Sequence, residues 1–82
     1  MQKQLAGMAV CGEIPVHYFL LEERMEDQAA VYGVSVEYGG EEDSVRQLAG
    51  SRERVETLLA ALARGSVTPV ALRDVVEDWL LQ

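Results

Sequence analysis

The sequence predicts an α+β domain in which a three-stranded antiparallel meander is followed by a helical hairpin packed on one face of the sheet, in the order β-β-β-α-α. Residues 30–38 alternate apolar with small or polar side chains, which is the period of a half-buried strand. Residues 51–81 carry two apolar stripes at helical spacing, separated by a glycine and a proline. Short turn sequences join the predicted elements, which favours neighbouring antiparallel strands.

Residues 1–13 show no clear period, so the sequence leaves them as a flexible arm or a short first strand ahead of a single α+β domain at residues 14–82. The β-branched and aromatic run at residues 16–21 predicts the first strand of the meander. Both faces of this strand are apolar, so we expect both to be covered. A helix at residues 19–30 is the alternative, because strong helix formers fill much of that stretch.

The predicted second strand, residues 30–38, follows the first through a polar loop at residues 26–28, a connection long enough for antiparallel neighbours. The paired glycines within residues 39–42 indicate a second turn, since glycine adopts positive φ without strain. A short third strand is predicted from residues 44–48, ending at Gly50 just before the Ser51 cap.

The first helix is predicted to follow the N-cap Ser51 and to end near Arg64, whose cation suits the carboxyl end of a helix dipole. We expect Gly65 to be the left-handed residue after this helix. The apolar stripe of the helix consists of Val55, Leu58, Leu59 and Leu62.

The second helix is predicted to be capped by Thr68 and to have Pro69 as its first residue, where a missing N–H costs nothing. We expect Trp79 to anchor this helix in the core, because an aromatic side chain on the apolar stripe buries a large area. The stripe consists of Leu72, Val75, Val76, Trp79 and Leu80.

Charge and cysteine content restrict the function and the compartment. The chain of 82 residues has a net charge of −7, and residues 13–50 contain nine acidic and two basic side chains. Such a surface repels phosphate backbones and anionic lipids, so we expect neither nucleic-acid nor membrane binding. The single Cys11 excludes an intrachain disulfide and favours a cytoplasmic location.

The sequence offers no recognisable set of catalytic, cofactor-binding or metal-ligating residues, and we expect a non-catalytic protein without cofactors. Cys11 and His17 are the nearest approach to a nucleophile and a base. A small-ligand or enzymatic site in a cleft near Cys11, His17 and Tyr18 is therefore the alternative. A buried thiol and a strand histidine are the favoured interpretation.

We expect a protein-interaction or self-association module. A homodimer built through the sheet would cover the second apolar face of residues 16–21, for which residues 1–10 folded back as an arm are the alternative cover. Acidic mimicry that regulates a nucleic-acid-binding protein is a further alternative. The candidate contact residues are tyrosines of the outer sheet face and charged residues of the second helix: Tyr18, Tyr32, Arg73, Asp74, Glu77 and Asp78. Residues 73 and 77 have the i, i+4 spacing of an ion pair on a helix.

Residues 67–80 carry a Pro-to-Trp segment that, together with residues 51–53 and 32–33, resembles a family of small uncharacterised proteins from clostridia-like Firmicutes, a domain of unknown function. The resemblance extends over residues 18–80. In that family a His usually stands at the position of Ala71. The resemblance implies a bacterial, cytoplasmic protein and transfers no activity and no site residues.

Overall fold

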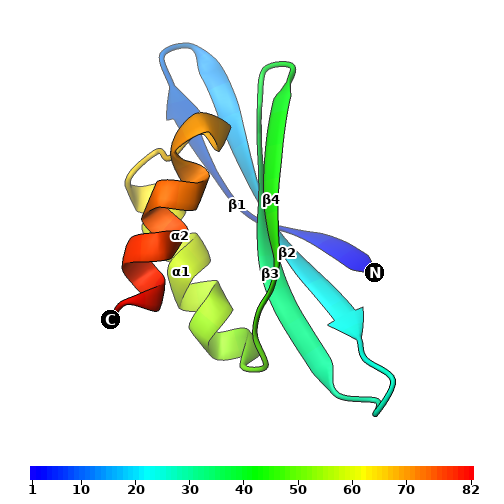
Figure 1. Cartoon of the computed structure of the whole chain (residues 1–82). Coiled ribbons are helices and arrows are strands. Elements are labelled where there is room, and N and C mark those ends of the chain that lie inside the picture. The colour runs from blue at the N-terminus through cyan, green and yellow to red at the C-terminus, as the bar shows by residue number, and fades with distance from the viewer.

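The computed structural model describes residues 1–82 and contains a four-stranded antiparallel sheet with two helices on one side of it (Figure 1). The strands lie in chain order across the sheet as β1 (Gln2–Cys11), β2 (Ile14–Arg24), β3 (Ala30–Tyr38) and β4 (Glu41–Ala49). Helix α1 (Arg52–Arg64), the 3-10 turn η1 (Pro69–Ala71) and helix α2 (Leu72–Leu80) follow. None of these helices is long and apolar enough to cross a membrane. The α+β class and the antiparallel sheet are confirmed, whereas the predicted number of three strands is wrong.

The additional strand is β1, which forms within the segment that the sequence left as an arm or a strand. It pairs antiparallel with β2 along its length. A β-bulge between Leu5 and Gly7 shifts the register, so the side chains after the bulge point to the opposite face from the one that simple alternation gives. This interruption removes the two-residue period, which is why residues 1–13 show no strand pattern in the sequence.

β2 and β4 extend beyond the predicted ranges, whereas β3 matches its range. β2 is extended through Arg24, so a helix at residues 19–30 does not form. Pairing with β1 and β3 on both sides outweighs the local helix propensity of this stretch. β4 begins at Glu41, because the turn before it consists only of Gly39 and Gly40, with Gly39 at a φ of 60°. The acidic residues predicted to lie in that turn therefore belong to the strand.

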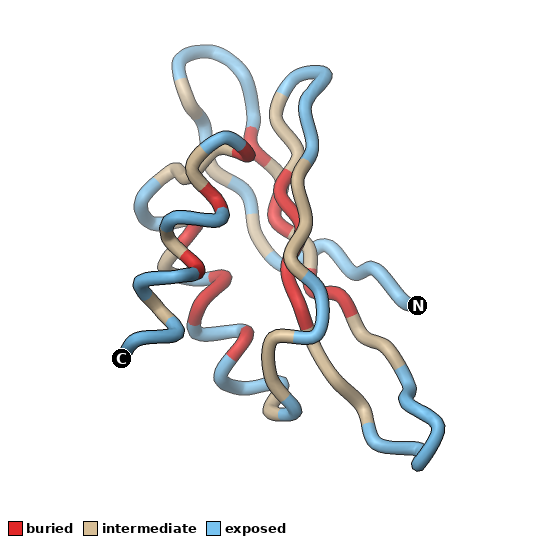
Figure 2. Tube along the Cα trace, viewed as in Figure 1, coloured by how far each residue is buried: buried red, intermediate tan, exposed pale blue.

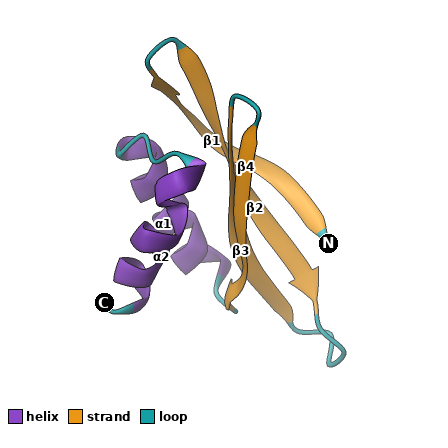
Figure 3. Ribbon diagram, turned by 45° about the horizontal axis from the view of Figure 1, so that its top comes forward, coloured by secondary structure: helices purple, strands orange, loops and turns teal.

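Both helices pack on the same face of the sheet, which we call the inner face, and no helix covers the other, outer face (Figure 3). Helix α1 contacts all four strands, and the edge strand β4 is in addition contacted by η1 and α2. The inner face and the helical stripes meet in one core (Figure 2), whose buried residues are Val16, Tyr18, Leu20, Val34, Val36, Val55, Leu58, Leu59, Leu62, Leu72 and Val76. The predicted stripe of α1 is thus confirmed in full.

Helix α1 has the predicted N-cap, but its left-handed C-terminal residue is not the predicted one. Ser51 Oγ accepts a hydrogen bond from a backbone N–H of the first turn at 3.3 Å. Gly65 has a φ of −89°, whereas Ser66 has a φ of 50°. The N–H groups of Ser66 and Val67 bond to carbonyls of the last helical turn, which is a Schellman motif. The helix ends at Arg64 as predicted, but Gly65 keeps a negative φ, so the left-handed position falls on Ser66.

Helix α2 is shorter than predicted, and its last turn is only partly covered. Pro69 begins η1 instead of an α-helix, and the side chain of Thr68 makes no capping hydrogen bond. Trp79 packs against the core but is only half-buried, and the Arg54 guanidinium lies 5.0 Å from its ring centroid. Leu80 is 53% exposed, so its predicted place on the buried stripe is wrong. In this last turn only Trp79 reaches the core.

Gly33 of β3 lies beneath a bulge in β4. The register of β3 and β4 shifts at this residue, and Gln47 of β4 takes a φ of 55°. A Cβ atom on Gly33 would lie 2.9 Å from the Cα of Arg46 and closer still to the carbonyl oxygen of Val45. Glycine is required here because the backbone of β4 passes directly over this position.

Candidate interaction surface

Tyr18, predicted to lie on an exposed outer face, lies in the core. Its side chain is fully buried on the inner face, and its hydroxyl donates a hydrogen bond of 2.8 Å to the carbonyl oxygen of Val67. Burial raises the pKa of the Tyr18 hydroxyl above its ordinary value. The outer-face assignment is wrong because alternation separates Tyr18 from Phe19 without saying which of the two faces the helices cover.

Tyr32 shares the inner face with Tyr18 and is half-buried beside the core. Its neighbour across the sheet is Ala49, at the end of β4, and this residue also packs against the core. Neither tyrosine contributes to the outer face, so the predicted tyrosine surface does not form.

Arg73 connects α2 to β4. Its guanidinium donates to both carboxylate oxygens of Asp43, at 3.0 and 3.1 Å, and to the carbonyl oxygen of Ser44 at 3.2 Å. This pairing holds the pKa of the Asp43 carboxyl below its ordinary value. Because its guanidinium is directed at β4, Arg73 does not form the predicted ion pair with Glu77.

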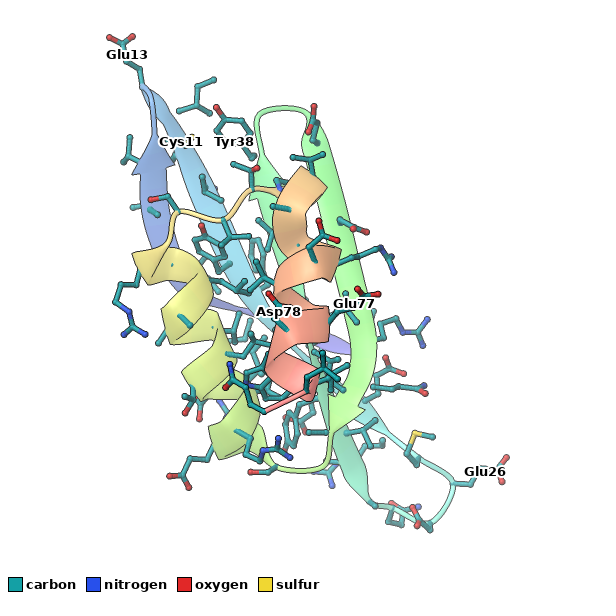
Figure 4. The ribbon with its side chains drawn as sticks, turned by 60° about the vertical axis from the view of Figure 1, so that its left-hand side comes forward. Cys11, Glu13, Glu26, Tyr38, Glu77 and Asp78 are labelled. Atoms are coloured by element: carbon teal, nitrogen blue, oxygen red, sulfur yellow. The ribbon has the colours of Figure 1, made fainter.

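The acidic residues of α2 are the part of the predicted surface that stays exposed. Asp74, Glu77 and Asp78 all lie in solvent, and none of the ion pairs in the chain includes them. Figure 4 shows the carboxylates of Glu77 and Asp78 projecting from α2. We call these three residues the α2 acidic face.

Cys11 and His17 lie on opposite faces of the sheet. Cys11 packs against the core on the inner face, beside Tyr38, whose hydroxyl donates to the Cys11 carbonyl oxygen at 3.4 Å (Figure 4). His17 stands between Val16 and Tyr18, which both point inward, so its ring is on the outer face. The two side chains therefore cannot act together as nucleophile and base. The chain also has no group of three or more His, Cys, Asp and Glu residues that could hold a metal ion.

A shallow groove of about 340 Å³ lies between α1 and α2. Its lining includes the small side chain of Ala61, the ring of Trp79 and the opposite charges of Arg64 and Asp78. This groove is remote in the chain from Cys11 and His17. A small ligand would therefore have to bind elsewhere than in the cleft that the sequence suggested.

The outer face carries an apolar strip that the sequence did not reveal. Leu5, Met8 and Val10 of β1 point to this face and are 57%, 61% and 61% exposed. We call them the β1 strip. They lie opposite the outward residues of β2, Phe19, His17 and Pro15. Leu5 and Met8 are three residues apart, so in a regular strand they would face opposite sides, and only the bulge brings them together.

The remainder of the outer face is largely polar. Arg46 donates to both carboxylate oxygens of Glu23, at 2.6 and 2.8 Å, and this pairing lowers the pKa of Glu23 to about 2. Lys3 pairs with Glu37, and its ammonium lies 4.5 Å from the centroid of the Phe19 ring. The outer face is therefore divided into a network of ion pairs reaching from β1 to β4 and an apolar strip along the edge of β1.

Comparison with known proteins identifies the family. The model of a family of unknown function (DUF6514) matches residues 6–82, from the bulge of β1 to the end of the chain. No curated protein and no solved structure gives a significant match. With β2 to β4, both helices and the second part of β1 inside the matched region, the chain belongs to the DUF6514 family of unknown function.

Proposed function

We propose that this chain is a small bacterial, cytoplasmic and non-catalytic module that binds another protein or a second copy of itself through the β1 strip. One observation carries the proposal: Leu5, Met8 and Val10 expose more than half of their surface on a sheet face without a helical cover. Large apolar side chains that cluster on the surface of a small domain commonly mark an interface.

The surroundings of the strip support a protein partner. The outward residues beside it on β2 include Phe19, and phenylalanine and methionine side chains are enriched at interfaces. No charged residue lies between Gln4 and Gly12, so an apolar partner surface meets no buried charge along β1. The separation of Cys11 from His17 by the sheet supports a non-catalytic role, because His17 is the only imidazole in the chain.

Capture of partners from the native host, compared between the wild-type protein and two variants, tests the proposal. Wild-type protein is compared with Met8→Glu, which places a charge in the strip, and with Val70→Glu, a matched change at a residue of η1 that is 86% exposed. We expect Met8→Glu to lose the proteins, or the second copy, that Val70→Glu retains. A captured set that neither variant changes, while both remain folded by circular dichroism, would contradict the assignment of the strip.

The α2 acidic face is a second candidate contact surface. Asp74, Glu77 and Asp78 form no ion pair within the chain, so their field is available to a basic partner, including a nucleic-acid-binding protein regulated by acidic mimicry. The same field repels phosphates, and we therefore propose no direct binding to nucleic acid. Joint replacement of the three carboxylates by amides should remove basic partners and leave those of the β1 strip. Loss of both sets, or of neither, would argue against this second surface.

A further inference from the structure

We propose that two copies of the chain associate through the edges of β1, which pair antiparallel so that Met8 of each copy lies opposite Val10 of the other. The pairing doubles the four-stranded sheet and continues it across a two-fold axis. This inference rests on the proposed function and names its partner as a second copy.

The two edges of the sheet are protected very differently. β4 carries Glu41, Glu42, Asp43 and Arg46, and the carbonyl oxygen of Ser44 already accepts a hydrogen bond from Arg73. β1 has no charged residue after Lys3 and no proline, and no side chain donates to the backbone of its central residues. Charges, prolines, bulges and covering elements are the usual protection of an edge strand, and β1 has only the bulge between Leu5 and Gly7, which leaves the stretch after it as a site for strand pairing.

The register of β1 with β2 shows which backbone groups of β1 point toward the free edge of the sheet. Val10 lies opposite Pro15, which has no N–H to donate, so this pair occupies a non-hydrogen-bonded position. The two-residue turn closes on the next pair, Cys11 and Ile14, whose backbone groups bond to each other in such hairpins. By alternation the N–H and C=O groups of Met8 and Val10 point away from β2, toward the free edge.

One antiparallel register pairs both residues whose backbone groups point toward the free edge, Met8 and Val10. With the two-fold axis beside Ala9, each Met8–Val10 pair exchanges both of its backbone hydrogen bonds. The side chains of these residues all lie on the outer face, so the β1 strips of the two copies become continuous. An axis beside Met8 would place the bulged Ala6 opposite Val10, and an axis beside Val10 would place Met8 opposite the turn at Gly12. The Ala9 register is therefore the one that fits.

Charge distribution favours a second copy as the occupant. The chain has a net charge of −7, yet its acidic residues are concentrated away from the β1 edge. The α2 acidic face and the acidic start of β4 belong to the opposite side, because α2 packs near β4. Pairing at β1 keeps these like charges far apart, whereas pairing at β4 would bring them together. Because the paired segment is short, the dimer is expected to be weak and concentration-dependent.

Two measurements on the full chain test the inference. Sedimentation velocity should show a monomer–dimer equilibrium between about 10 µM and about 1 mM, and Val10→Pro should raise the dimer dissociation constant at least about tenfold, because it removes an outward N–H from each copy. Val10→Thr, which keeps the N–H and the shape, should shift the constant far less.

The second measurement reports the register itself. In a Cys11→Ser background, Ala9→Cys places two thiols directly opposite each other across the axis, where Cα atoms lie about 4.5 Å apart and a disulfide can form. Mild oxidation should therefore give a covalent dimer at least about tenfold faster than Ala60→Cys, an exposed control on α1 in the same background.

A wild-type chain that stays monomeric throughout, or equal cross-linking at positions 9 and 60, would overturn the inference. So would a dimer that persists undiminished in Val10→Pro. The proposed function fails separately, since the comparison of Met8→Glu with Val70→Glu reports any partner of the strip, whether or not it is a second copy.

Discussion

Replacement of Gly33 by alanine tests how closely β4 passes over the sheet. The added Cβ would approach the backbone of Arg46 to 2.9 Å and that of Val45 more closely, whereas ordinary contacts begin near 3.4 Å. The bulged segment of β4 must therefore move outward by roughly half an ångström or more, against its pairing with β3 and the ion pair of Arg46 with Glu23. Overpacking of this kind costs about 1–3 kcal/mol.

The same substitution also has a stabilising effect, which is smaller than the cost of overpacking. Alanine restricts the unfolded chain more than glycine does and stabilises by about 0.4–1 kcal/mol where the backbone conformation allows it. We therefore expect Gly33→Ala to lower the free energy of unfolding by about 1–2 kcal/mol, which corresponds to a fall in melting temperature of about 4–16 °C for a domain of this size.

Urea denaturation followed by Trp79 fluorescence and by circular dichroism measures the change. Gly40→Ala is the matched control, because a Cβ at Gly40 meets no atom within 4 Å and its φ is not in the left-handed region. If Gly33→Ala and Gly40→Ala unfold at the same urea concentration, the bulge of β4 yields without cost and the close approach does not constrain the sheet.

Three further predictions concern the C-terminal end of α1, the buried hydroxyl of Tyr18 and the ion pair of Glu23 with Arg46. Ser66→Gly and Gly65→Ala should each raise the free energy of unfolding by about 0.5–1 kcal/mol. The first removes a serine from the left-handed region, and the second restricts the unfolded chain at a residue whose native φ is −89°. Destabilisation by Gly65→Ala would mean that the position after α1 requires glycine. Tyr18→Phe should cost about 1–2 kcal/mol in urea denaturation, because it leaves the carbonyl oxygen between α1 and η1 without its donor; an unchanged midpoint would mean that water replaces the hydroxyl. The folded pKa of Glu23 is about 2 and its ordinary value is 4.5, so its pairing with Arg46 stabilises the fold above pH 4.5 and loses that contribution as the pH falls toward 2. Glu23→Gln should flatten the loss of stability over this interval, and parallel curves for the two proteins would refute the assignment.

The elements that the sequence predicts well are those whose pattern is local and one-sided. Residues 30–38 form β3 over the whole predicted range, and the four stripe residues of α1 are all buried. In both cases the apolar side chains gather on the one face that meets the core, so the period of the sequence reports the structure directly. The N-cap Ser51 is likewise a local signal, because its hydroxyl and the N–H that it caps are only three residues apart.

The failures come from features that depend on contacts across the sheet. The bulge of β1 is stable only because β2 holds the strand on either side of it, and it hides the period that would have revealed the strand. Two residues of the candidate site were misplaced for the same reason: Tyr18 and Arg73 look like free surface groups in the sequence, yet each has its partner at least 29 residues away, in Val67 and in Asp43 with Ser44. No short-range pattern reports such pairs.

The outer face shows how an apolar strand face can be covered without a helix or a second subunit. Leu21 points outward but is only 2% exposed. Its neighbours across the sheet are Lys3 on one side and Gly33 on the other, and the bulged backbone of β4 passes over Gly33. The sheet therefore covers the outward side of this part of β2 with its own side chains and backbone. The original reason for expecting a dimer, two apolar faces on residues 16–21, is thereby weakened, because the apolar surface that remains open belongs to β1. The two-fold pairing of Met8 with Val10 satisfies the free backbone edge of β1 and brings the strips of the two copies into contact side by side.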